Sequence, residues 1–140
     1  MPYEIYWHID KRVIGTRFYG EVIEADLSSN GAQVKEYIQQ GIPPLFFLVD
    51  TRDITQYPTN LKDLLEAMGK NPSNSNNLKW TFVVSNNRLI NFMGTIAANI
   101  FHTPIRMCKT REEAETYIAI QAPELADLLP TQKSPQSDVG

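Results

Sequence analysis

The sequence Leu45-Phe46-Phe47-Leu48-Val49 is an uninterrupted apolar run, and it is followed at once by Asp50-Thr51-Arg52-Asp53. Five consecutive apolar residues leave no polar face for solvent. Such a run is typical of a strand that is covered on both sides in a parallel sheet. Pro43 and Pro44 precede the run, and the charged residues after it predict a turn. We therefore expect Leu45 to Val49 to be the central strand of the fold.

The rest of the chain alternates between strand and helix patterns around this segment. Two strands at the N-terminus are so closely linked that they must pair antiparallel. The predicted strands are Tyr3 to Asp10, Val13 to Tyr19, Leu45 to Val49, Leu78 to Ser85 and Ile105 to Cys108; the predicted helices are Glu24 to Gln40, one with Asn60 as its N-terminal cap, Leu89 to Phe101, and one after Thr110. Strands that alternate with helices imply right-handed crossovers and parallel neighbours.

The predicted fold is therefore α/β. It has a single sheet of about five strands, mostly parallel with an antiparallel N-terminal edge strand, and helices packed on it. Residues 1–129 form one domain in this interpretation. Residues 130–140 lack an apolar pattern and are predicted to be a tail.

Local signals support two of the helices. Thr110 and Glu113 match a capping box, in which each side chain bonds a backbone N–H at the start of the helix. Glu24 and Asp26 lie where the helix dipole favours acidic residues. The stretch Ser28 to Gly31 is weak helix-forming sequence, so that helix could instead begin after it.

Composition and charge argue against several classes of function. The chain has 140 residues with a formal net charge of −3, which argues against a nucleic-acid binder. Its longest apolar run is far too short to span a membrane. One cysteine and two histidines make a metal site improbable, and no cofactor is expected. No secretory signal is visible, so the cytoplasm is the expected compartment.

Three stretches of the chain resemble the SpoIIAA-like, or STAS-like, group of small α/β domains. They are Arg12 to Val22, Leu48 to Asp53, and Thr110 to Ala114. The resemblance implies a non-enzymatic module that docks a protein partner or a second copy of itself as a homodimer. It also implies an alternative, because the SpoIIAA-like branch is similar in fold to the lipid-carrying CRAL-TRIO domains.

The phosphorylated members of this group carry an Asp-Ser-Ser-Gly-like turn after the central strand. This chain has Asp50-Thr51-Arg52-Asp53 there, so only the aspartate matches and Arg52 and Asp53 replace small residues. Thr51 is the candidate phosphoacceptor that the resemblance leaves.

Polar residues follow the predicted strands at the ends where open α/β sheets bind ligands. The candidate partner- or ligand-binding residues are Asp50, Thr51, Arg52, Asp53, Ser85 and Asn87. The alternative is structural: Asp50, Thr51 and Asp53 bond turn amides and pair with Arg52.

Two further hypotheses stay open at this stage. A small apolar ligand such as a lipid could lie between the sheet and the helix that carries Phe92, Ile96 and Phe101. An enzyme could use Asp50 and Asp53 as a carboxylate pair. The histidines His8 and His102, together with Cys108, are expected to be packing or surface residues rather than ligands or nucleophiles.

Overall fold

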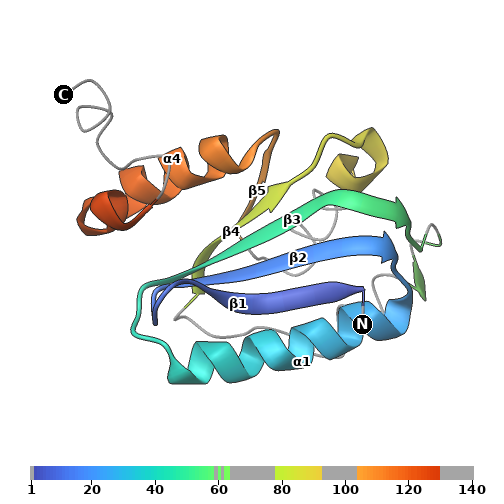
Figure 1. Cartoon of the computed structure of the whole chain (residues 1–140), viewed down its shortest axis with the longest axis horizontal. Coiled ribbons are helices and arrows are strands. Elements are labelled where there is room, and N and C mark those ends of the chain that lie inside the picture. The colour runs from blue at the N-terminus through green and yellow to red at the C-terminus, as the bar shows by residue number, and fades with distance from the viewer. Residues whose placement is uncertain (1, 59, 61, 64–77, 93–103, 130–140) are drawn as a thin grey trace.

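The computed structural model describes residues 2–58, 60, 62–63, 78–92 and 104–129 (Figure 1). Five strands form one sheet in the order β1-β2-β3-β4-β5. The elements are β1 (Tyr3–Ile9), β2 (Val13–Glu21), α1 (Glu24–Gln40), β3 (Leu45–Gln56), β4 (Leu78–Val84), β5 (Ile105–Cys108), α4 (Arg111–Gln121) and the 3-10 helix η1 (Pro123–Leu128).

The strand directions confirm the predicted class of fold. β1 pairs antiparallel with β2 at one edge, and β2, β3, β4 and β5 are all parallel. α1 packs on one face of this sheet, and α4 with η1 packs on the other (Figure 1). β3 is the middle strand, as its apolar run predicts.

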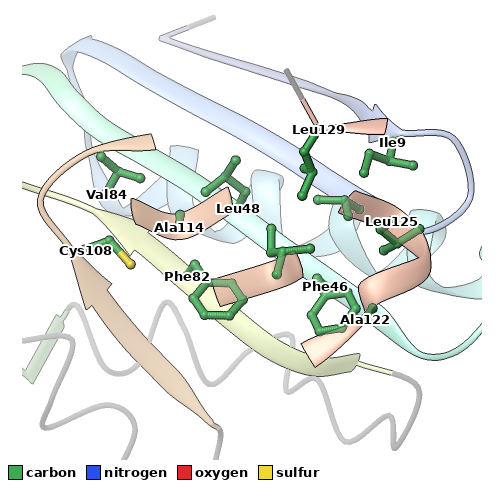
Figure 2. Packing of buried hydrophobic residues seen from close by; sticks show 12 residues of the cluster. Ile9, Phe46, Leu48, Phe82, Val84, Cys108, Ala114, Ala122, Leu125 and Leu129 are labelled. Carbon is green, nitrogen blue, oxygen red and sulfur yellow. The ribbon is translucent and has the colours of Figure 1, made fainter. Parts of the chain in front are cut away.

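The core fills both faces of β3. Leu45 and Val49 face α1, whereas Phe46 and Leu48 face α4. Figure 2 shows the cluster under α4 and η1, which consists of Ile9, Val13, Phe46, Leu48, Phe82, Val84, Cys108, Ala114, Ile118, Ala122, Leu125 and Leu129. Side chains that alternate between two buried faces explain why this strand carries no polar residue before Asp50.

The predicted turn at Asp50 to Asp53 is wrong, because β3 continues to Gln56. β2 supplies the reason. It runs on to Glu21 and stays paired with β3 beyond Asp50, with Tyr19 opposite Asp53 and Gly20 opposite Ile54. Two register irregularities bend the pair but do not end it.

Two smaller expectations are also settled. α1 begins at Glu24, so the later start after Gly31 is excluded. Strict alternation along β1 predicts that Ile9 shares a face with Ile5 and Trp7, but a register irregularity between Trp7 and Ile9 turns it to the α4 face.

Some predictions fall on residues that the structure does not describe. Asn60 does cap the next helix, since its Oδ1 accepts the backbone N–H of Asp63 at 3.2 Å. The remainder of that helix, the helix of Leu89 to Phe101 beyond Phe92, and the tail at 130–140 lie outside the described residues. Among the helices in the described residues, none is long and apolar enough to cross a membrane.

Candidate functional site

β3 extends past the end of its neighbour β4, and this extension carries the candidate residues. The last β4 residue paired with β3 is Val84, which lies opposite Asp50. We call residues Asp50–Gln56 the β3 extension. It is paired with β2 along one side, so the side chains of Asp50, Arg52 and Asp53 are held on strand backbone, with a register irregularity between Asp50 and Asp53, rather than on a loop.

Asp50 and Arg52 form a tight ion pair at the base of the β3 extension. Asp50 Oδ1 accepts hydrogen bonds at 3.0 Å from both the backbone N–H and the Nε of Arg52, and Oδ2 accepts one from Nη2 at 2.9 Å. Burial alone would raise the pKa of Asp50. The hydrogen bonds from Arg52 and the nearby charge of Arg111 outweigh burial, so the pKa of Asp50 lies below its ordinary value.

Arg17 of β2 contacts three side chains on the exposed part of the surface next to the β3 extension. Its Nε and Nη2 both reach Asp53 Oδ2 at 2.9 Å, and its Nη1 donates to Glu4 Oε1 at 3.1 Å. The guanidinium also lies 4.9 Å from the ring centroid of Tyr19. These contacts fix a flexible side chain that is still 40% exposed.

Thr51, the candidate phosphoacceptor, lies in mid-strand and not at a helix start. Its hydroxyl donates to the carbonyl oxygen of Val84 at 2.7 Å, across the end of β4. A phosphate on this oxygen would remove that donor. Phosphorylation of Thr51 stays a prediction.

Ser85 and Asn87 lie next to the β3 extension, but their polar groups serve the local backbone. Ser85 is buried, and its Oγ accepts the backbone N–H of Asn87 at 3.1 Å. Asn87 Oδ1 accepts the backbone N–H groups of Leu89 and Ile90, so it caps the helix that follows. Tyr57, just after β3, donates to the same oxygen at 3.3 Å and joins the two segments.

Among the described residues, the contacts of the two aspartates are therefore explained by the structural alternative, in which they bond backbone amides and pair with arginine. Asp50 bonds an amide and pairs with Arg52, as expected, whereas Asp53 pairs with Arg17 instead. Acid–base catalysis by this carboxylate pair would need at least one carboxyl group that changes protonation near neutral pH. Arginine neighbours and a lowered pKa work against that role for Asp50.

Sequence reasoning missed a polar cluster between β1 and α4. His8 Nε2 lies 2.8 Å from Glu115 Oε2, and Arg111 Nη2 lies 3.3 Å from His8 Nδ1. His8 is a buried packing residue, as expected. The available signals were the polar residue at each alternate position of β1 and the four-residue spacing of Arg111 and Glu115, which places both on one side of α4.

Two other expectations concern possible ligands. Cys108 is buried, and burial is the main reason that its pKa rises to about 11, with a further contribution from Glu113. The helix proposed to line an apolar pocket lies mostly outside the described residues, so the carrier hypothesis stays a prediction. Among the described residues, no group of three or more His, Cys, Asp or Glu side chains could hold a metal ion.

The order and pairing of the strands place the protein in the class of α/β domains with a SpoIIAA-like fold. The chain is similar to the crystal structure of an uncharacterized protein from the DUF3478 family, with a SpoIIAA-like fold, from Shewanella loihica PV-4. The two share 12% sequence identity with a TM-score of 0.57, and the match covers 82% of this chain and 90% of that one. No family model and no curated protein matches the sequence.

Proposed function

We propose that this chain is a non-enzymatic interaction module of the STAS-like type that docks a protein partner, or a second copy of itself, through the β3 extension. The observation that carries the proposal is the length of β3. The strand runs beyond Val84, where β4 ends, and so presents exposed charged side chains on rigid backbone.

The chemistry of this surface fits protein recognition. The side chains of Arg17 and Asp53 are 40% and 54% exposed, so a partner can reach them. Their ion pairs already fix their conformations, and this lowers the entropy lost on docking. Arginine and tyrosine, here Arg17 over Tyr19, are enriched in protein interfaces.

Site-specific photo-cross-linking in the native cells tests the proposal. A photoreactive amino acid replaces Thr55, which is exposed on the β3 extension, or Gln39, which is exposed at the end of α1. We expect one discrete cross-linked product from position 55 and none from position 39. Sedimentation velocity of the purified chain then distinguishes a partner protein from a second copy.

Two arginine substitutions provide a matched comparison. Arg17→Ala removes the ion pairs to Asp53 and Glu4 on the proposed surface. Arg12→Ala removes an ion pair to Glu124 at the start of β2, the opposite end of that strand. We expect the first variant to lose the cross-linked product and the second to keep it. Equal products from positions 55 and 39, or no product with a monomer in sedimentation, would refute the proposal.

A further inference from the structure

His8 lies between two charged residues of α4, inside the protein. Its side chain is 6% exposed and that of Glu115 is 3% exposed, so water does not replace either contact. Glu115 Oε2 approaches one ring nitrogen at 2.8 Å, and Arg111 Nη2 approaches the other at 3.3 Å. The three side chains join the edge strand β1 to the first two turns of α4.

The partners of His8 assign the roles of its ring nitrogens. A guanidinium can only donate, so Nδ1 of His8 accepts from Arg111. An ionised carboxylate can only accept, so Nε2 donates to Glu115. A neutral imidazole with its proton on Nε2 satisfies both neighbours at once. A protonated ring would place an N–H on Nδ1 directly against the N–H groups of Arg111.

The charges around His8 follow the same logic. Arg111 and Glu115 on α4 carry one positive and one negative charge, which balance each other around a neutral ring. On β1 the ring of Tyr6 lies 6.4 Å away, centroid to centroid. Beyond Tyr6 lie the charges that act on its hydroxyl, which belong to Arg111, Asp50, Glu4 and Arg17.

Arg111 also lies within electrostatic reach of the β3 extension, since its charge contributes to the low pKa of Asp50. A change in the His8 contact would alter the charge near the base of the proposed docking surface.

We propose that His8 is a proton-operated latch, which holds Arg111 against β1 while its ring is neutral and releases Arg111 when the ring is protonated. The imidazole is the side chain whose ordinary charge change falls between pH 5 and 8. The regulatory consequence, a docking surface whose charge depends on pH, rests on the proposed function. The latch itself does not.

Nuclear magnetic resonance of the full chain tests the latch without any partner. The imidazole nitrogens of His8 are followed from pH 7.5 to pH 5.5, with His102→Gln used to identify the signals. At pH 7.5 we expect the proton on Nε2. When Nδ1 becomes protonated as the pH is lowered, we expect the exchange of the Arg111 guanidinium protons to rise roughly three- to tenfold relative to those of Arg12, as the loss of one hydrogen bond predicts.

The variant His8→Gln is the matched control. A glutamine amide can donate to Glu115 and accept from Arg111, and it does not titrate. In this variant we expect the exchange of the Arg111 guanidinium protons, relative to those of Arg12, to be the same at pH 7.5 and pH 5.5. A proton on Nδ1 at pH 7.5 would overturn the latch. So would a response of Arg111 in His8→Gln equal to that of the wild-type chain.

Cross-linking from position 55 at pH 7.5 and pH 6.0 tests the regulatory step separately. We expect the yield to change severalfold in the wild-type chain and to stay constant in His8→Gln. A yield that is equal at both pH values overturns the regulation and leaves the proposed docking intact. Absence of any product refutes docking and its regulation together, and the resonance experiment alone then decides the latch.

Discussion

Asp50 shows how one side chain can serve both the fold and a surface. It is nearly buried, yet it stays ionised because Arg52 supplies three hydrogen bonds to its two oxygens. A charged group at this depth is tolerated only when it is paired in this way. The pairing also orients Arg52, which is one of the residues that a partner would meet.

Arg52→Gln should destabilise the protein at neutral pH, because it leaves the Asp50 carboxylate with fewer donors. We expect the free energy of unfolding to fall by roughly 1–3 kcal/mol at pH 7. The pKa of Asp50 is lowered in the folded state, so the stabilising contribution is complete above the ordinary value of 3.8 and is lost as the pH falls through the folded value. In urea unfolding, the free energies of unfolding of the two proteins should converge once the pH is below the pKa of Asp50 in the folded state. A constant difference at all pH values would contradict this account.

Cys108 should be inert toward thiol reagents in the folded protein. With a pKa of about 11, roughly one thiol in a thousand is ionised at pH 8. We expect modification by a chromogenic disulfide at pH 8 to be roughly a hundredfold slower than in the urea-unfolded chain, where the thiol has an ordinary pKa. Equal rates in the two states would show that the thiol is not buried.

Among the elements, β1 and β2 fit together because of a glycine. Tyr6 lies opposite Gly15 across the two strands, and its ring lies over the glycine. A Cβ on Gly15 would lie 2.7 Å from Tyr6 Cζ, which is too close for any side chain. The glycine thus allows the Tyr6 ring to lie over β2.

Gly15→Ala should therefore force Tyr6 out of its position. We expect a loss of roughly 1–3 kcal/mol in the free energy of unfolding, the usual cost of overpacking. In a Tyr6→Ala background the same substitution should be close to neutral, because the clashing ring is gone. Urea unfolding of the four proteins in this double-mutant cycle measures the coupling. An equal loss in the free energy of unfolding in both backgrounds would show that the clash is not with Tyr6.

The weak stretch of α1 is helical for a tertiary reason. Asn30 Nδ2 donates to Thr16 Oγ1 at 3.1 Å, and both residues are buried. Ser29 Oγ lies 2.7 Å from the hydroxyl of Tyr3 on β1. These polar residues have low helix propensity, but their bonds to the sheet hold the helix in place.

At the scale of the whole molecule, η1 closes the core on the α4 face. Leu125 and Leu129 are 2% and 0% exposed and belong to the same buried cluster as Ile9 (Figure 2). Among the described residues, Leu129 is the last member of this cluster. The domain limit at residue 129 stays a prediction, because residues 130–140 lie outside the described part of the chain.

Two shortened chains test that limit. A chain that ends at Leu129 should unfold with the same free energy as the full chain, since 130–140 has no apolar pattern. A chain that ends at Ala122 should lose roughly 3–6 kcal/mol, the value of burying two leucine side chains. Thermal and urea unfolding measure both. A large loss in the longer chain would place part of the domain beyond residue 129.

The sequence by itself determined the order of the elements, the parallel sheet around Leu45 to Val49, and the caps at Asn60 and Thr110. These features follow from periodicity and from contacts within a few residues, which a single sequence displays directly. Only the tertiary structure decided the length of β3, because the strand continues as long as β2 lies beside it. It alone also brought His8 together with Glu115, 107 residues away, because no local pattern records which distant side chains a fold makes neighbours.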